Sequence, residues 1–344
     1  VIDFGTLPVL APLTPPFCMV GAPHRVRVKN AATDLLKLGI NGMHDKSVGD
    51  MIYSKGQLIG VGRLCTLIED HKKYWSFGGA NNGAFVRTAA LTTRYREVDK
   101  VLSVHDSLHR APISAAKSCA SGKWFVTGCI DSTLRVWTYD GLSLSLKANL
   151  CGHDGAAITC VDLSPVCGVV ATGCAGGRVL LWDLRTLTFV RELPHNVGLG
   201  EVTSVSINYR NGNVLTLVEG HLHIFDINGN LLGSIFIDEA NRPTCATATS
   251  CPEWQENGVV AVTGHLTGEV RFWGLNYRER KLATMHILQD NPHSNPITAL
   301  KVTGTDRQDT LLVGDQAGKL SVSKAVQMDT LGPDDLNRII EELS

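Results

Sequence analysis

The sequence predicts an all-β fold built from repeated four-stranded units. Three stretches indicate it, because each contains a Thr-Gly pair and a Trp ten residues after the Thr. They span residues 126–137, 171–182 and 262–273, and each reads as a strand, a polar turn and a second strand. The 34 glycines and the 6% share of aromatic residues also suit many short strands joined by tight turns.

Three less regular copies, at residues 77–87, 217–225 and 313–323, extend the repeat to six. Successive copies end 50, 45, 43, 48 and 50 residues apart, which is close to the period of a four-stranded propeller blade. Alternating apolar runs before and after each copy, such as 158–163 and 188–191, supply the other two strands. We therefore expect a β-propeller with seven blades or, as the alternative, six.

The chain is predicted to divide into three parts. Residues 1–47 are rich in Pro and form a linker that could donate a strand to the propeller. Residues 48–326 form the propeller, and residues 327–344 contain a short C-terminal helix. In that helix Pro333 fits the first turn, and Asp334 and Asp335 suit its positive end.

Composition argues against several classes of partner and site. Lys and Arg number 32 against 33 for Asp and Glu, so no overall charge draws the chain to nucleic acid or to an anionic membrane. No apolar run approaches the ~18 residues that span a bilayer, so we expect any membrane association to be indirect. The ten cysteines include no Cys-x-x-Cys pair, which favours a reduced, cytoplasmic protein with neither metal nor cofactor.

The recurring Thr and Trp are predicted to be structural, because a buried indole N–H and a buried hydroxyl each need a hydrogen-bond partner. We expect His153 to serve Thr172 and Trp182, and Asp131 to serve Thr127 and Trp137. The residues assigned to this frame are Thr127, Trp137, His153, Thr172, Trp182, Thr263 and Trp273.

The turns between the paired strands are the candidate protein-binding or peptide-binding site, because turns can vary while strands are held by packing. Catalysis is not expected, since no nucleophile elbow, metal pair or phosphate loop is present. The basic and aromatic residues at 72–75 read as a solvated strand end rather than a nucleic-acid site. The candidate rim residues are Asn81, Asn82, Asp131, Ser132, Arg178, His221, Thr267, Glu269, Gln316 and Lys319.

The repeats resemble WD repeats, in which Gly-His opens a unit and Trp-Asp closes it. Gly152-His153 and Trp182-Asp183 match, whereas most other copies close differently and Arg87 and Ser323 replace the aromatic residue. The resemblance implies a WD-repeat propeller, with less regular hydrogen bonding expected in the first, fourth and sixth units.

A further resemblance covers most of the chain. The segment 2–8 (Ile-Asp-Phe-Gly-Thr-Leu-Pro) is similar to the closing segment of a BEACH (Beige and Chediak-Higashi) domain, and motifs at 182–189, 223–230 and 262–273 resemble the FYVE-containing members of that family. It implies a large scaffold in vesicle trafficking, lysosome-related membrane events or selective autophagy, cytoplasmic and peripheral to endomembranes. Its propeller would bind proteins beside its own upstream BEACH domain. The alternatives are a propeller that mainly braces the BEACH domain, or a generic assembly scaffold unrelated to membranes.

Overall fold

The structure is a computed structural model that describes part of the chain. It gives the backbone of residues 10–12 and of the strands between 50 and 105, and most of the chain from 109 to 325. The main gaps in that last part lie at 120–122, 140–143, 196–199, 250–257, 289–292, 306–307 and 318–319. The predicted C-terminal helix and most of residues 1–47 lie outside the described residues, so the domain boundaries at 47 and 326 stay predictions.

Six antiparallel units of four strands follow one another along the chain, and we number them as blades one to six. The outer strands of blades four and five meet through a parallel pairing of Ser234 with Lys281, which joins these two units into one eight-stranded sheet. Blade one contains β4 (Cys65–Leu67), β5 (Lys73–Ala80), β6 (Gly83–Leu91) and β7 (Val98–His105). Blade two contains β8 (Ile113–Ser118), β9 (Trp124–Cys129), β10 (Thr133–Tyr139) and β11 (Leu144–Cys151). Blade three contains β12 (Ile158–Ser164), β13 (Val169–Cys174), β14 (Val179–Asp183) and β15 (Thr188–Glu192).

The second half of the chain repeats the pattern. Blade four contains β16 (Val202–Ile207), β17 (Val214–Val218), β18 (His221–Phe225) and β19 (Leu231–Phe236). Blade five contains β20 (Pro243–Ala248), β21 (Val259–His265), β22 (Val270–Asn276) and β23 (Lys281–Ile287). Blade six contains β24 (Ile297–Thr305), β25 (Gln308–Asp315), β26 (Leu320–Ala325) and, from the other end of the chain, β1 (Leu10–Pro12).

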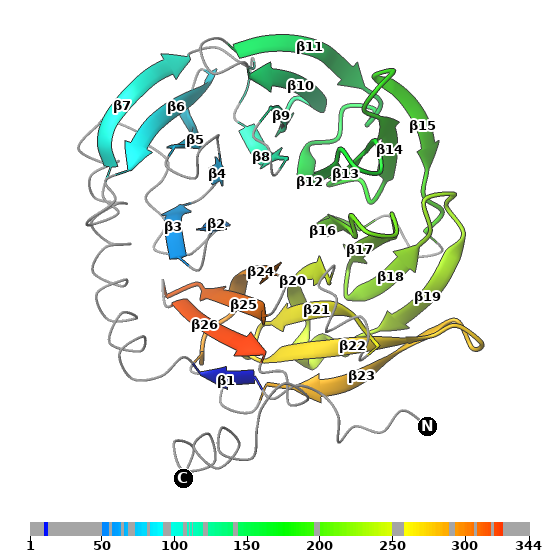
Figure 1. The fold of residues 1–344 in the computed structure, drawn as a ribbon. Helices are drawn as coiled ribbons and strands as arrows, with labels where there is room; N and C mark the ends of the chain where they lie inside the picture. Colours follow the sequence, from blue (N-terminus) through cyan, green and yellow to red (C-terminus); the bar gives the residue numbers. More distant parts are fainter. Residues whose placement is uncertain are drawn as a thin grey trace.

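The sheets stand around a common axis, with the first strand of each blade nearest the centre and the last strand outside (Figure 1). The innermost strands β4, β8, β12, β16, β20 and β24 contact one another in that order. A two-stranded sheet of β2 (Asp50–Ser54) and β3 (Gln57–Gly62) closes the ring, because β2 contacts both β24 and β4. The all-β propeller is therefore confirmed, while the blade count stays open between the predicted seven and six, since this sheet shows two strands rather than four.

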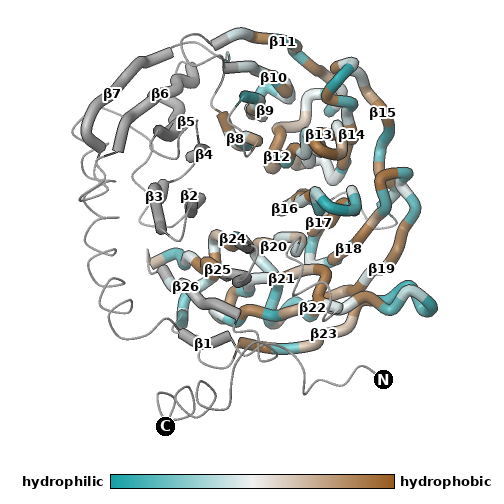
Figure 2. Tube along the Cα trace, in the orientation of Figure 1, coloured by the Kyte–Doolittle hydropathy of each residue, from teal (hydrophilic) through white to brown (hydrophobic). Residues whose placement is uncertain are grey.

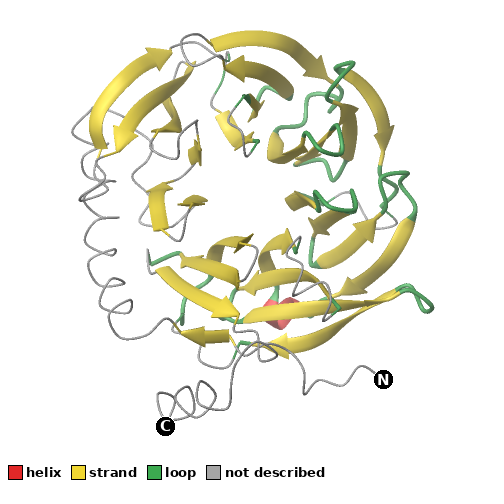
Figure 3. Ribbon diagram, in the orientation of Figure 1, coloured by secondary structure: helices red, strands yellow, loops and turns green. Residues whose placement is uncertain are grey.

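Each of the six repeat copies recognised in the sequence is the central hairpin of one blade. In blade three, for example, Val170 faces Trp182 across β13 and β14. Within the described residues the helical structure is one 3-10 turn, η3 (Glu239–Asn241), and the rest is strand and turn (Figure 3). The alternating pattern fixes this register, because a slip of one residue would turn every apolar side chain to the other face.

The hydrophobic core lies between the blades rather than inside any one of them. One cluster joins Val126 and Leu134 of blade two to Ile158 and Leu180 of blade three, and matching clusters fill the next three interfaces. Hydrophobic residues accordingly gather on inner strands such as β8 and β12, while the turn between β22 and β23 is hydrophilic (Figure 2). Burying one such aliphatic side chain contributes about 1.5–3 kcal/mol, so each blade depends on its neighbours.

The Gly of each Thr-Gly pair is required by close packing against the next blade. A Cβ added at Gly173 would lie 2.6 Å from a γ-carbon of Val202, and two other glycines meet the first residue of the next blade in the same way. The pairs are Gly128 with Ile158, Gly173 with Val202 and Gly264 with Ile297. The repeat therefore keeps Gly where the blades approach most closely.

Hydroxyl groups on the innermost strands also link neighbouring blades. The Thr159 Oγ1 donates to the carbonyl oxygen of Val202 at 2.5 Å, and Thr244 makes the same bond to Ile297. Ser114 does so to the carbonyl oxygen of Ile158. A hydroxyl at the second position of the innermost strand therefore links blade two to blade three, blade three to blade four, and blade five to blade six.

We predict that Gly173→Ala lowers the free energy of unfolding by about 1–3 kcal/mol, because the methyl group would force Val202 and Cys160 apart. Gly176→Ala is the matched control, since its added Cβ would lie 3.4 Å from the Cβ of Ala156, an ordinary contact. We expect the control to change stability by no more than about 0.5 kcal/mol. Urea denaturation measures both, and equal losses would contradict the packing argument.

Candidate functional site

A buried chain of hydrogen bonds runs through the centre of blades two, three and five. The Nε1–H of Trp182 donates to the Thr172 hydroxyl at 2.9 Å, and the Nε2 of His153 lies 2.8 Å from the same oxygen. The equivalent bonds join Trp137 to Thr127 and Trp273 to Thr263, at 2.9 and 2.8 Å. We call this arrangement the indole relay; it ties a loop or turn at one end of the blade to the middle of the sheet.

The imidazole of the indole relay comes from different places in different blades. In blade two it is His109, whose Nε2 lies 2.7 Å from the Thr127 hydroxyl. The expectation that Asp131 serves Thr127 is therefore wrong: its carboxylate accepts from the backbone N–H and hydroxyl of Thr133, directly after the turn. In blade five the imidazole is His265, at the end of β21 itself.

Blades four and six depart from the relay, and each still uses a histidine, which is half-buried in blade four and buried in blade six. In blade four His195 lies 3.0 Å from the Thr216 hydroxyl, while Phe225 takes the place of the Trp. In blade six the His293 ring bridges the Asp315 carboxylate and the Ser321 hydroxyl, both at 2.8 Å. The histidines that begin these hydrogen-bond chains could not be assigned from sequence, because His109, His195 and His293 lie in loops of irregular length.

Burial favours the neutral form of the His109 and His153 imidazoles, and of His223 on β18. Desolvation lowers the pKa of His109, His153 and His223 to about 4 each. For His153 the nearby Arg178 guanidinium lowers the pKa further, whereas the Glu192 and Asp154 carboxylates oppose the shift. A neutral ring can accept a hydrogen bond at one nitrogen and donate at the other, as the relay requires.

The described candidate rim residues all lie in or beside the turn between the second and third strands of their blades, and so at the same end of each sheet. Asp131 and Ser132 lie in the turn of blade two, and Arg178 directly before β14. The others are His221 in blade four, Thr267 and Glu269 in blade five and Gln316 in blade six. Asn81, Asn82 and Lys319 lie outside the described residues.

Several rim side chains hold their turns in place. The Arg178 guanidinium donates to both oxygens of Glu192, at 3.0 and 2.8 Å, to the carbonyl oxygen of Gly152 at 3.1 Å and to the Asp154 carboxylate. These bonds join the loop that opens blade three to its third and fourth strands. They also lower the pKa of Glu192.

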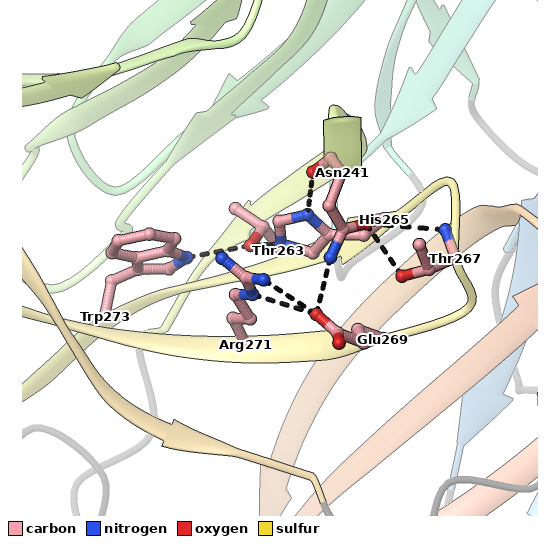
Figure 4. A network of polar contacts seen from close by, with 7 residues as sticks. All are labelled: Asn241, Thr263, His265, Thr267, Glu269, Arg271 and Trp273. Atoms are coloured by element: carbon pink, nitrogen blue, oxygen red, sulfur yellow. Dashed lines mark hydrogen bonds and ion pairs between the residues drawn. The ribbon is translucent and has the colours of Figure 1, made fainter. Parts of the chain in front are cut away.

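Blade five builds its rim as a polar network (Figure 4). The side-chain amide of Asn241 donates to Glu269 at 2.5 Å and accepts from the Thr267 hydroxyl at 2.7 Å. The backbone carbonyl oxygen of Asn241 lies 2.7 Å from Nδ1 of His265. The Glu269 carboxylate also accepts two bonds from Arg271, which lower the pKa of Glu269. The indole relay of blade five therefore continues to the surface turn.

Sequence reasoning selected polar turn residues and missed the apolar ones beside them. Ile130, Phe236 and Leu266 are 48%, 52% and 44% exposed at this end of the blades. The sequence carried a signal, because Ile130 and Leu266 occupy the same turn position after the Gly-Cys or Gly-His of their copies. Contiguous exposed apolar surface marks interaction sites, so these side chains are candidates for contact with a protein partner where they lie on neighbouring blades.

Three histidines gather beneath this part of blade four. The rings of His195 and His223 lie 5.3 Å apart, and those of His221 and His223 stack at 6.0 Å. Both ring nitrogens of His223 are buried without a hydrogen-bond partner within the part of the chain that the structure describes. Such a group is costly to charge, which agrees with its lowered pKa.

Comparison with known proteins agrees with this geometry. The family described as "WD domain, G-beta repeat" matches residues 100–138 and 144–183. Each match spans the outer strand of one blade and the three inner strands of the next. The WD40 domain of Toxoplasma gondii coronin has a similar fold, with a TM-score of 0.57 and 14% identity over 77% of this chain and 70% of that one. The chain is a WD-repeat β-propeller.

Sequence relatives narrow the class further. Protein SPIRRIG of Arabidopsis thaliana is 31% identical over 64% of this chain, and BEACH domain-containing protein A2 of the same plant is 29% identical over 80%. Human WD repeat- and FYVE domain-containing protein 4 is 28% identical over 51%. The matches cover 7%, 8% and 6% of those proteins. This chain is a BEACH-family WD-repeat region.

Two separate findings bear on the remaining sequence expectations. In the described part of the chain, no helix has the length and apolar character needed to cross a membrane. The seven cysteines that the structure describes are all free thiols, and burial raises the pKa of Cys160 and Cys245 to about 12.

We predict that Thr172→Val costs about 1–3 kcal/mol of unfolding free energy, because it removes the acceptor of the Trp182 indole and the partner of His153 with little change in volume. A double-mutant cycle with Trp182→Phe tests the relay. The two losses should overlap by at least about 0.5 kcal/mol, measured by chemical denaturation. Strictly additive losses would show that the two side chains act independently.

We predict that stability falls as the pH drops from about 6.5 towards 4. The unfolded chain binds protons at His153 and His223 with a pKa near 6.5, whereas the folded protein binds them only near 4. Stability from these groups is complete above pH 6.5, and each contributes a slope of up to about 1.4 kcal/mol per pH unit below it. Urea midpoints at several pH values measure the slope, and His223→Phe should reduce it by about one proton. An unchanged slope in that variant would rule out His223 as a source.

Proposed function

We propose that this propeller is the protein-binding end of a non-catalytic, BEACH-type scaffold acting in vesicle trafficking, lysosome-related membrane events or selective autophagy. The rim of blades four and five is the observation that supports it. There two apolar side chains are exposed, Phe236 at the end of β19 and Leu266 in the turn after β21, and the backbone beside each is held by a hydrogen bond. A rigid surface of this kind binds a protein segment without losing much conformational entropy.

The rim of blades four and five is continuous across the two sheets. The backbone N–H of Ile237 donates to the carbonyl oxygen of Gly220 at 3.0 Å, which sets Phe236 beside the turn between β17 and β18. The N–H of Leu266 donates to the carbonyl oxygen of Arg242 at 3.1 Å, just after η3. The two apolar side chains thus flank one short segment, 237–242.

Charge suggests the kind of segment that would bind. The exposed side chains of Glu219, Asp238 and Glu239 lie along this part of the rim. Carboxylates around an apolar centre favour a protein or peptide partner with a basic residue beside an apolar one. The chain's net charge of −1 gives no comparable reason to propose nucleic acid, and membrane contact is proposed only through partners, at a cytoplasmic site peripheral to endomembranes.

The His293–Asp315–Ser321 arrangement supports a structural role better than a catalytic one. It has the order of a hydrolase triad, but the side chains of His293 and Asp315 are completely buried. A histidine acting as general base must reach the substrate's reacting group. Blades two, three and four contain the same kind of contact, a histidine from the preceding loop bonded to a hydroxyl inside the sheet, and there it is structural.

Two alternatives remain compatible with the fold: the propeller could chiefly brace an upstream BEACH domain, or serve as a generic assembly scaffold unrelated to membranes. The pairing of β1 with β26 supports the first, because it ties an early segment of the chain to the last blade. Bracing predicts that the rim can be altered without loss of partners.

We predict that Phe236→Asp with Leu266→Asp lowers recovery of specific partners at least tenfold, because a charge replaces each apolar contact. Affinity capture from the source cell with quantitative mass spectrometry measures it. The matched control is Tyr209→Asp with Tyr277→Asp, since these tyrosines are 49% and 64% exposed in turns at the opposite end of the same blades. Equal recovery with both variants would favour the bracing role.

A further inference from the structure

Blade two brings three metal-binding side chains together at its rim. A ring nitrogen of His109, the thiol of Cys129 and the carboxylate of Asp131 all lie within 4.8 Å of one another. Among the described residues this is the one group of three or more such side chains close enough to hold an ion. His109 and Cys129 are buried, so the group differs from the exposed acidic clusters common on protein surfaces.

The local sequence explains why the group forms in this blade. Cys129 ends β9, Asp131 follows in the turn, and the loop before β8 carries His109. Blade three has a buried cysteine at the same position, Cys174, and a relay histidine, but Gly176 stands where blade two has Asp131. The Gly-Cys-x-Asp sequence and the relay histidine therefore coincide in blade two and not in blade three.

Neighbouring groups already orient two of the three side chains. The Thr127 hydroxyl fixes one ring nitrogen of His109 at 2.7 Å, and Thr133 holds the Asp131 carboxylate through its backbone N–H at 3.0 Å. Metal-binding histidines and carboxylates usually have such outer partners, which set their orientation. The second ring nitrogen of His109 lies 3.2 Å from the Thr133 hydroxyl, a longer contact that a metal ion can replace.

We propose that His109, Cys129 and Asp131 bind a zinc ion at the rim of blade two. Nitrogen, sulfur and oxygen donors together suit Zn²⁺, whereas Mg²⁺ and Ca²⁺ prefer oxygen alone. Binding replaces the thiol proton of Cys129, which passes to solvent, and thiolate plus carboxylate then balance the dication.

Three protein ligands leave a fourth position for water or for a donor from a bound protein. Zinc binding requires the nitrogen, sulfur and oxygen ligand atoms, now within 4.8 Å of one another, to lie about 2.0–2.3 Å from the ion. The ion would fasten the loop before β8 to the turn between β9 and β10.

Zinc titration of the full chain after treatment with a chelator tests the site. Competition against a chromogenic chelator gives the affinity and stoichiometry, and Co²⁺ in place of Zn²⁺ gives a thiolate charge-transfer band. We expect about one ion per chain, and at least about 100-fold weaker binding with Cys129→Ser or Asp131→Asn, since even an outer partner contributes about 10–100-fold. Cys174→Ser, the matched control, should keep the affinity and the band.

Two results would overturn the proposal. Parent-like affinity in Cys129→Ser and Asp131→Asn would indicate an adventitious ion only, bound for example at the exposed thiol of Cys151. An equal loss of zinc affinity in Cys174→Ser would indicate the same. The absence of stoichiometric binding by the parent chain would overturn it directly. Circular dichroism of each metal-free variant separates loss of the ligand from loss of the fold, and Asp131→Asn, in a partly exposed turn, should fold in either case.

Discussion

The buried threonine hydroxyl at the centre of the indole relay is the interaction on which the propeller most depends. It accepts the indole N–H and pairs with one nitrogen of an imidazole, so one oxygen bonds to two buried rings. In blade three Thr172 thereby ties Trp182 to the opening loop through His153. Because an unmet buried polar group costs more than a formed bond contributes, the relay favours one register in the blades that contain it, blades two, three and five.

Packing between blades then turns separate sheets into one ring. Glycines such as Gly173 let the next blade's first residue approach, and hydroxyls such as that of Thr159 bond to its carbonyl oxygen. Neither interaction can form within a single blade. Stability is therefore a property of neighbouring pairs, as in other repeat proteins, and a change at one interface should weaken the blades on both sides.

The same frame decides where function can reside. Residues such as Arg178 and Glu269, which look available in the sequence, hold turns through ion pairs and hydrogen bonds. Exposed apolar side chains such as Leu266 stand on those turns. A rim built in this way separates the groups that maintain shape from the groups that can contact a partner, so blades can diverge in binding while keeping one fold.

The sequence by itself determined the all-β propeller, the six central hairpins and the Thr–Trp pairs such as Thr172 and Trp182, because these depend on periodicity and on spacing within one hairpin. It could not assign His109 in place of Asp131. A loop histidine enters its blade from 18 residues before Thr127, and only packing decides which polar group arrives. The tertiary structure likewise decided how the ring closes, which rim residues are tied down and that Cys129 meets His109, since each depends on contacts between segments far apart in the chain.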